Sequence, residues 1–468
     1  MRTETRSLTR RPHRLADRAI PRGALLLSAL SVGYFAAGIV RNRIFANEFG
    51  ISAELDAYNA AFRIPEIALD ILVGAGLSAP FVPIFTRLLG GDAPDADTDG
   101  ARRATAFGQT VLTAALGAMA VVLVLLFIAA PWVADTIWSG FDAPTRALYV
   151  QLVRINCVAQ LLFAASMALG ELLVARRRFL SYGLAPILYT TGIVVGSVVL
   201  GPRIGVAGAA WGAVGGAFAH LASRSIAAMR AGFRIRLRLE LRTAEFREFF
   251  RLMLPRMLSY PIDPIVVAYL TVLAVGLGAG TASALSFVLD YQFVPVQVIA
   301  ISFSLAAFPL LSETWNAGDG PAFRRLAVRN IVVIGVLTTV AAVALAVLAE
   351  PLVERLLGGG KFDATAVAVT SSLLVAFAIS IPIDSLSYPL SRALYASHNT
   401  IWQVASSLLG LGALVVAAQV LVPAAGASGI AFAYAIGGGV KLVGLTLALL
   451  PRLRAAPRSV TAETISPA

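Results

Sequence analysis

Charged residues are scarce in this chain of 468 residues, and so are cysteine and histidine. Only 14% of the residues are Asp, Glu, Lys or Arg, whereas soluble proteins carry about 25%. The single cysteine, Cys157, excludes an intramolecular disulfide and a cysteine-cluster metal site. The histidines at 13, 220 and 398 are too scattered for a zinc motif or a Ser-His-Asp arrangement. We therefore expect neither an enzyme nor a bound cofactor.

Long apolar runs are what the sequence has in abundance. Hydrophobic residues make up 58% of the chain, and the mean hydropathy is +0.80. A spanning helix needs roughly 20 apolar residues, and such runs follow one another from Ala24 to Leu450. They are continuous rather than alternating, which argues against a membrane barrel. The sequence therefore predicts an all-α polytopic membrane protein of about twelve transmembrane helices. We place these helices at 24–41, 57–88, 104–131, 146–174, 180–200, 205–228, 252–276, 281–312, 327–349, 364–396, 401–421 and 427–450.

The net charge of +12 invites a nucleic-acid interpretation, but its distribution favours another. With the N-terminus inside, most of the 38 Lys and Arg fall in the N-terminal tail and in the even-numbered loops, as the positive-inside rule requires. The first apolar run lacks a signal-peptide cleavage site, so we read it as an uncleaved helix. We therefore expect no nucleic-acid partner, a location in the bacterial cytoplasmic (inner) membrane, and both termini in the cytoplasm.

Similar segments recur at an offset of 221 residues. LGELLVA from Leu169 matches LSRALYA from Leu390, and GVAGAAW from Gly205 matches GASGIAF from Gly426. Repeated halves are common in secondary transporters. The repeat predicts two pseudo-symmetric six-helix lobes in parallel orientation. The predicted domains are a basic tail (1–22), an N-lobe (23–228), a basic linker (229–251), a C-lobe (252–451) and a second tail (452–468).

Ionisable residues inside the expected spans are costly in lipid, so they usually face a cavity or a partner. Arg63, Glu66 and Asp70 are spaced i, i+3 and i+7, which places them on one helix face. Two interpretations remain open: a structural ion pair of Arg63 with Glu66 or Asp70, or a central polar cavity. The second lobe supplies further acids at Asp263, Asp290 and Asp384. Asp56 is interpreted only as the N-cap of the second helix.

The segment from Arg41 to Leu89 carries a family resemblance. Its pieces include Phe49-Gly50, Ile64-Pro65 and Phe81-Val82-Pro83, and further matches are Leu254-Pro255-Arg256, ERLLGGGKFD from Glu354 and GASGIAFA from Gly426. Together they resemble the MurJ/MviN family, lipid II flippases of the multidrug/oligosaccharidyl-lipid/polysaccharide exporter superfamily. The resemblance covers roughly residues 24–450 and implies a transporter fold.

Several positions depart from the family pattern. Phe35, Leu69, Asp70 and Asp290 stand where family members usually carry arginine, and Gly74 replaces a glutamate. The resemblance implies that those arginines hold a pyrophosphate and that two additional helices form a groove for the lipid tail. The chain ends at Ala468, so we expect no such helices. The fold therefore carries over better than lipid II as the substrate.

The leading hypothesis is an alternating-access flippase. It would move a lipid-linked envelope precursor, lipid II-like or another undecaprenyl-phosphate-linked glycan, from the inner to the outer leaflet. Arg41 and Arg63 would bind its phosphates, because a guanidinium stays charged and binds phosphate bidentately. The expected substrate-binding set is Arg41, Arg63, Glu66, Asp70, Asp263 and Asp290. Coupling to Na⁺ or H⁺ is expected at Asp70, Asp263, Asp290 and Asp384.

Two alternatives remain. An excess of cavity acids would suit a cation-coupled exporter of small molecules, of the multidrug and toxin extrusion (MATE) type. A membrane scaffold without transport would instead serve envelope assembly. The expected partners are membrane lipids, a lipid-linked substrate and envelope-synthesis proteins.

Overall fold

The computed structural model describes residues 22–90, 99–176, 178–259, 262–399 and 401–454. Nearly all of them are helical, and no strand is present in these ranges. Most of the two predicted tails, residues 1–21 and 455–468, lies outside the described residues.

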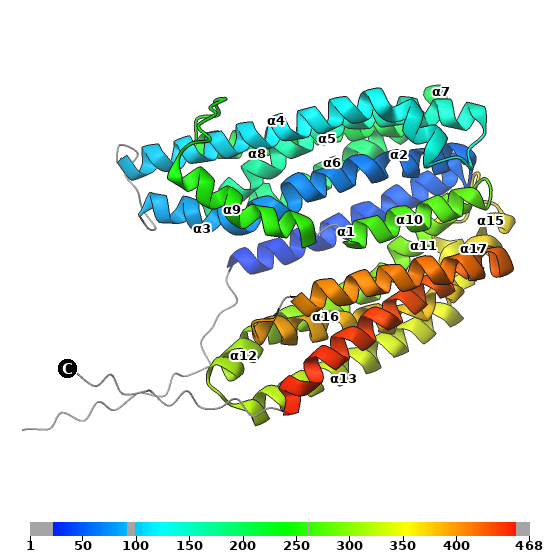
Figure 1. Cartoon of the computed structure of the whole chain (residues 1–468). Coiled ribbons are helices and arrows are strands. Elements are labelled where there is room, and N and C mark those ends of the chain that lie inside the picture. Colours follow the sequence, from blue (N-terminus) through cyan, green and yellow to red (C-terminus); the bar gives the residue numbers. More distant parts are fainter. Residues whose placement is uncertain (1–21, 91–98, 177, 260–261, 400, 455–468) are drawn as a thin grey trace, which may run out of the picture.

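The helices form two bundles, which Figure 1 shows one above the other. The first bundle consists of α1 (Arg22–Phe49), α2 (Ala53–Leu69), the π-helical turn η1 (Asp70–Gly74), α3 (Ala75–Leu89), α4 (Asp99–Thr136), α5 (Ala143–Ala175), α6 (Phe179–Val199), α7 (Gly201–Ile204) and α8 (Val206–Arg230). After α9 (Ala244–Ser259), the second bundle consists of α10 (Ile262–Gly276), α11 (Thr281–Pro295), the π-helical turn η2 (Val296–Ile301), α12 (Ser302–Asn316), α13 (Gly320–Val347), α14 (Ala349–Leu357), α15 (Ala364–Ala378), α16 (Ser380–Ala396) and α17 (Ile401–Arg454).

The described part of the chain contains six helices that are each long and apolar enough to cross a membrane. The bent pair α15–α16, with an angle of 43°, makes a seventh span. The remaining expected spans correspond to α1, α2–η1–α3, α8, the end of α9 with α10, and the second half of α17, which changes direction at Gly426. The prediction of an all-α membrane protein with about twelve spans is therefore confirmed.

The 221-residue offset reappears in the helix boundaries. α4 begins at Asp99 and α13 at Gly320, while α5 begins at Ala143 and α15 at Ala364. The same offset relates two unusual backbone conformations, at Gly205 (φ 60°, ψ −144°) and Gly426 (φ 56°, ψ −133°). Only glycine adopts such angles without strain. The repeat seen in the sequence is therefore a repeat of local structure.

The second helix of each bundle is interrupted by a π-helical turn. η1 follows α2, which contains Pro65, and η2 follows directly after Pro295 of α11. Proline removes a backbone donor and disturbs the helical ladder, and π-helical turns often mark functional sites. Asp70 is the first residue of η1.

The linker between the bundles leads into a helix that packs on the first bundle. Residues 233–240 are extended, and α9 then packs on α3 and α4 of the first bundle. The sequence predicts a C-lobe that begins at residue 252, which lies within α9. In the structure, the helix continues to Ser259 and stays with the first bundle.

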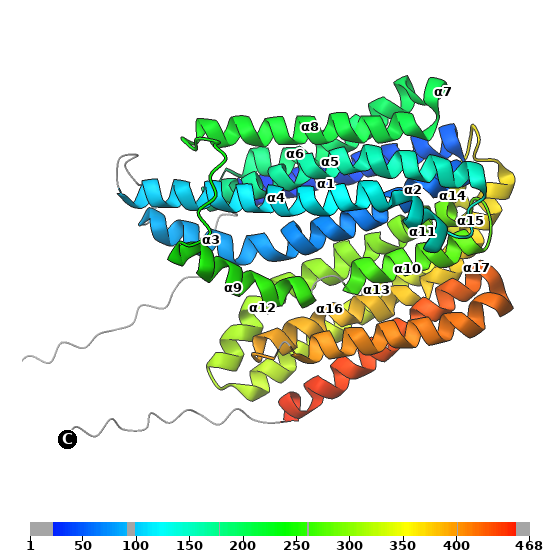
Figure 2. The same cartoon turned by 45° about the horizontal axis from the view of Figure 1, so that its top comes forward.

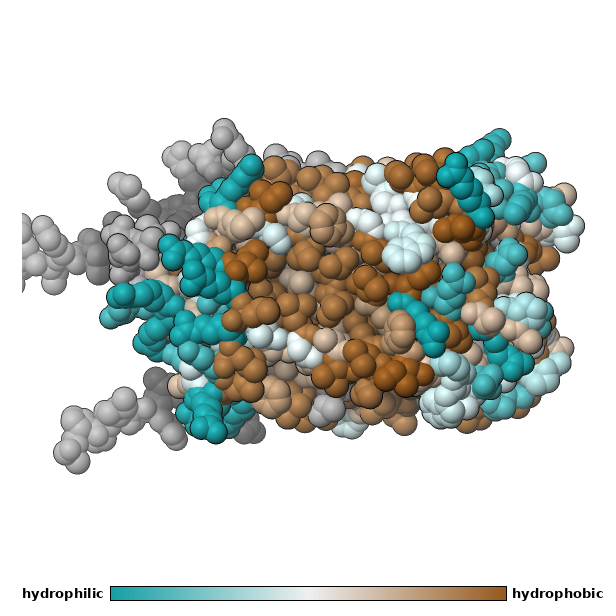
Figure 3. All heavy atoms as spheres, turned by 90° about the horizontal axis from the view of Figure 1, so that it is seen from above, coloured by the Kyte–Doolittle hydropathy of each residue, from teal (hydrophilic) through white to brown (hydrophobic). Residues whose placement is uncertain are grey.

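The two bundles meet near one end of the molecule. α2 contacts α10 and α11, and α1 contacts α14. The start of α1 and the end of α17 both lie at the opposite end, as Figures 1 and 2 show, and Figure 1 shows the bundles diverging there. Figure 3 shows an apolar belt between two hydrophilic ends, as expected of a protein that spans a bilayer.

Candidate functional site

A cavity of about 630 Å³ lies between the two bundles and is lined by both. A smaller cavity of about 150 Å³ adjoins it, and Arg63, Glu66 and Asp290 line both. Arg63 lies ten residues beyond the start of α2, which is roughly 15 Å along the helix axis. The site is therefore near the middle of the apolar belt.

All residues selected from the sequence lie around these two cavities. Six of them line the larger one: Arg63, Glu66, Asp70, Asp263, Asp290 and Asp384. Arg41 lines the smaller one. The structure thus brings together residues from α1, α2, η1, α10, α11 and α16.

Arg63, Glu66 and Asp70 share one face, as their spacing predicts, and that face borders the larger cavity. Arg63 Nη1 lies 4.0 Å from Glu66 Oε2, at the limit of an ion pair. Arg63 Nε is buried and has no hydrogen-bond partner among the described residues. A guanidinium with a buried, unpaired N–H retains capacity for a further acceptor.

Arg41 forms more ion-pair and hydrogen-bond contacts within the protein than we expected. Its Nη2 lies 2.9 Å from Asp290 Oδ2, and its Nε and Nη2 donate to Asn42 Oδ1. Asn42 Nδ2 also donates to Asp290 Oδ2, at 2.9 Å. A phosphate would therefore have to compete with Asp290 for Arg41. These contacts also join the first bundle to the second.

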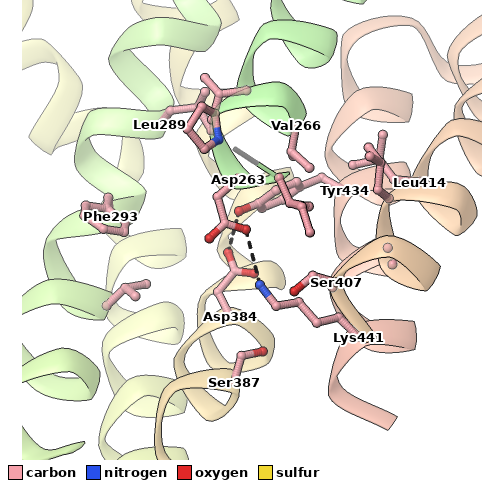
Figure 4. Close-up of a pocket in the computed structure, with 18 of the residues that line it drawn as sticks. Asp263, Val266, Leu289, Phe293, Asp384, Ser387, Ser407, Leu414, Tyr434 and Lys441 are labelled. Carbon is pink, nitrogen blue, oxygen red and sulfur yellow. Dashed lines mark hydrogen bonds and ion pairs between the residues drawn. The ribbon is translucent and has the colours of Figure 1, made fainter. Parts of the chain in front are cut away.

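The acids of the second bundle have their own partners, shown in Figure 4. Asp263 Oδ1 lies 3.3 Å from Lys441 Nζ. Asp384 Oδ2 accepts from Tyr434 Oη at 2.8 Å and from Gln292 Nε2 at 3.2 Å. Helices α10, α11, α16 and α17 supply these side chains. Two groups therefore lie beside the cavity: the Asp263–Lys441 ion pair, and Asp384 with its hydroxyl and amide donors.

Asp56 has a different role from the predicted one. Ser52 is the N-cap of α2, and its side chain accepts from Leu55 N. Asp56 instead accepts from Gly280 N and Ser283 N, each at 2.6 Å, and from Ser283 Oγ at 2.5 Å. The buried carboxylate therefore caps α11 across the interface between the bundles. The N-cap interpretation assigned Asp56 to the wrong helix.

Two cavity residues were missed in the sequence. They are Lys441 and Arg392, which both fall inside expected spans (427–450 and 364–396), where a charge is a usable signal. Arg392 lines the cavity near the end of α16, and its guanidinium lies 5.5 Å from the Phe308 ring centroid. With these residues, the lining of the larger cavity has five carboxylates and three basic groups.

Two ion pairs hold α9 on the first bundle. Both lie outside the membrane-spanning segments. Arg87 donates to both carboxylate oxygens of Glu248, and Arg103 donates to Glu245. Hydrogen bonds from these arginines lower the pKa of each carboxyl group. Since the folded-state pKa is lowered, the contacts are complete at neutral pH and are lost only as the pH falls below the ordinary range of glutamate, through the lowered pKa.

Comparisons with known proteins agree with this architecture. The family model "Lipid II flippase MurJ" matches residues 45–466. A probable lipid II flippase MurJ of Rhizobium meliloti is 26% identical over 452 residues, which cover 92% of this chain and 82% of the relative. The lipid II flippase MurJ of Burkholderia cenocepacia is 24% identical over 445 residues, with 92% and 84% covered.

Solved structures share the fold. Lipid II flippase MurJ in an inward closed conformation superposes with a TM-score of 0.78 at 18% identity, covering 92% of this chain and 89% of the other. A multidrug resistance MATE family transporter in an inward-facing conformation gives 0.75 at 14% identity, covering 93% and 99%. At these sequence identities, the structural similarity shows a shared fold and nothing further. The family model, in contrast, matches most of the sequence, and the chain therefore belongs to the lipid II flippase MurJ family.

Proposed function

We propose that this protein is an alternating-access flippase for a lipid-linked envelope precursor in the bacterial cytoplasmic membrane. The observation that carries the proposal is the charged cavity lined by both bundles of a MurJ-family chain. A site at the interface of repeated bundles can face either side of the membrane when one bundle rocks against the other. The moving bodies would be the lobes 23–228 and 252–451, with the contacts of α9 favouring a boundary nearer residue 260.

Phosphate recognition would depend mainly on Arg63 and Arg392. Arg63 has an unpaired Nε, and among the described residues Arg392 forms no ion pair. Arg41 would join after release from Asp290. Carboxylates Glu66 and Asp70 lie on the same face as Arg63, where they would meet hydroxyl or amide donors of a glycan. A cargo with both a phosphate and a polar headgroup fits this mixture of charges.

The flippase proposal is tested by reconstitution. The purified chain should accelerate movement of a fluorescent undecaprenyl-pyrophosphate glycan across proteoliposome membranes, and lipids of this class should co-purify with it by mass spectrometry. Absence of both signals, in a preparation that retains its helical circular dichroism, would contradict the proposal.

The alternative of a MATE-type exporter draws support from the five carboxylates in the cavity and from the shared fold. An exporter of cationic compounds should lower the accumulation of an organic dye in cells, whereas a flippase should not. A non-transporting scaffold would move neither the dye nor the glycan lipid and would bind envelope-synthesis proteins instead.

Coupling to Na⁺ or H⁺ is a further part of the proposal, and the position of Lys441 favours H⁺. Its ammonium already lies beside Asp263, where an external cation would otherwise bind. Lysine can also exchange a proton when it is partly buried. The Asp263–Lys441 pair, with Asp384 on the neighbouring part of the cavity wall, would then be the place where coupling acts.

Substitution of Lys441 tests this arrangement. Lys441→Gln removes the resident cation and leaves two carboxylates without it, so transport should become stimulated by Na⁺. Flipping rates in proteoliposomes with and without a Na⁺ gradient provide the measurement. Lys361→Gln is the matched control, because Lys361 is the other lysine of the chain and is exposed near α14. The same Na⁺ response in the original protein and in Lys441→Gln would count against the assignment.

We further propose that both termini and the linker between α8 and α9 are cytoplasmic. The positive-inside distribution supports this orientation, and the start of α1, the end of α17 and the linker lie at the same end in Figures 1 and 2. A cysteine at Arg236, on a Cys157→Ala background, should react with an impermeant maleimide only after the cells are opened. Labelling in intact cells would show that the linker faces outward and that the proposed topology is wrong.

A further inference from the structure

The linker contains an extended segment that the transport cycle does not use. Residues 233–242, here called the strap, have the sequence FRIRLRLELR. Residues 233–240 form no helix and pair with no strand in the described part of the chain. After buried Phe233, arginine or glutamate alternates with isoleucine or leucine. Because successive side chains of an extended chain point to opposite sides, this pattern gives residues 234–240 one charged edge and one apolar edge, and Leu241 and Arg242 follow in a turn.

The apolar edge is uncovered. Ile235, Leu237, Leu239 and Leu241 are 38%, 77%, 58% and 46% exposed. A contiguous row of exposed aliphatic side chains is unfavourable in water, at roughly 25 cal/mol for each Å² of apolar surface, and it usually marks an interaction surface.

The strap is held in place at its start. The Phe233 ring packs closely against Gly108. A Cβ at this glycine would lie only 3.1 Å from the ring. Gln109 Nε2 donates to Arg234 O at 2.6 Å, and Arg238 N donates to Thr113 Oγ1 at 3.0 Å. Figure 2 shows the segment crossing outside α4 on its way from α8 to α9. A segment bound to α4 by its own backbone presents its side chains in a defined direction.

This crossing lies where the apolar belt ends. The strap is near the same end of the molecule as the start of α1 and the end of α17 (Figure 2). Figure 3 shows that hydrophilic residues border the apolar belt at that end. A row of leucines at this depth can enter the acyl region, while the arginines of the other edge extend to the headgroups.

The charge of the strap indicates what binds to it. The strap carries Arg234, Arg236, Arg238 and Arg242 against one acid, Glu240, and Glu240 is already paired with Arg238 at 2.6 Å. Clusters of arginine next to a membrane attract anionic lipids. We infer that the strap is an interfacial binding site for anionic phospholipid headgroups, with its leucine edge inserted between the acyl chains and its arginine edge on the phosphates. This inference does not depend on the transported substrate.

The experiment uses the full chain in nanodiscs made of phosphatidylcholine, with or without phosphatidylglycerol. An environment-sensitive fluorophore is placed at residue 237 or at residue 236 on a Cys157→Ala background. In nanodiscs with phosphatidylglycerol, the probe at 237 should be quenched by doxyl-labelled lipid and shifted to shorter wavelength. The probe at 236 should be quenched by aqueous iodide. In phosphatidylcholine alone, quenching at 237 should be weaker.

Removal of charge tests the headgroup contact. The triple change Arg234→Gln, Arg236→Gln and Arg242→Gln should weaken anionic-lipid binding about fivefold for each arginine removed. For three arginines this amounts to about 100-fold, so half-maximal quenching at residue 237 should no longer be reached at phosphatidylglycerol fractions that saturate the original protein. The matched control is Arg324→Gln, Arg325→Gln and Arg329→Gln on α13, which removes three exposed arginines of the second bundle. This control should leave the titration at residue 237 unchanged.

Three outcomes would overturn the inference. A probe at 237 that remains accessible to iodide in both lipid mixtures would exclude membrane insertion. Lipid quenching that is equal without phosphatidylglycerol and in the triple variant would exclude headgroup recognition. Shielding of both edges only after another membrane protein is added would assign the strap to strand pairing with that protein.

Discussion

Replacement of Arg63 by alanine should abolish transport while leaving the protein folded. The nearest acid lies 4.0 Å away at Glu66 and the Arg63 Nε is unpaired, so the side chain contributes little to internal ion pairing. Its loss from a phosphate site should instead cost about 2–4 kcal/mol of binding, roughly 30- to 900-fold in affinity. Arg63→Lys should restore only part of this, because an ammonium lacks the planar fork of the guanidinium. Flipping rate, lipid co-purification and thermal stability are the three measurements.

Arg154→Ala is the matched control for this substitution. Arg154 is another arginine within a span of the first bundle, but it is exposed, and its guanidinium lies 5.0 Å from the Phe127 ring centroid. This control should transport normally. If Arg63→Ala instead unfolds the protein and Glu66→Gln restores its stability, the two residues form a structural pair. Phosphate binding would then depend on Arg392 and Arg41.

Asp56→Ala should shift the protein towards the state in which the bundles separate at the α11 N-terminus. The carboxylate accepts three hydrogen bonds across the interface, from Gly280 and Ser283. Hydrogen bonds to a charged group contribute about 1.5–3 kcal/mol each. The open state would hydrate the same groups, so the net shift should be about 3–5 kcal/mol, enough to change the population ratio more than 100-fold. Asp56→Asn should have a smaller effect, because one acceptor oxygen remains.

The shift can be measured with a cysteine at Ser286, which lines both cavities, on a Cys157→Ala background. Asp56→Ala should increase its labelling from the side opposite the termini. Glu54→Ala is the matched control, since Glu54 lies in the same first turn of α2 but is exposed. Equal labelling of the Asp56→Ala protein and the control would mean that Asp56 does not hold the interface closed.

Much of the architecture could be predicted because lipid imposes local rules. Each span must be apolar over its own length, and the expected spans agree with the helices to within several residues at most boundaries. The i, i+3, i+7 spacing of Arg63, Glu66 and Asp70 likewise placed them on one face, which lines the cavity.

The pairing of these charges could not be predicted. Arg41 pairs with Asp290, Asp56 with Ser283 and Lys441 with Asp263, each across more than 170 residues of chain. No periodicity in the sequence relates such positions. The same limit explains the wrong assignment of Asp56, because an acid in the first turn of one helix can equally cap a neighbouring helix.

By itself, the sequence determined the membrane class, the number and order of the spans, the repeat and the charged residues of the interior. These follow from hydropathy and helix periodicity, which act over a few turns of chain. Only the tertiary structure decided which charges neutralise one another, which end of the cavity is closed, and that α9 stays with the first bundle. Those features arise where two separately formed bundles meet, and the contacts between them depend on side-chain geometry across the interface.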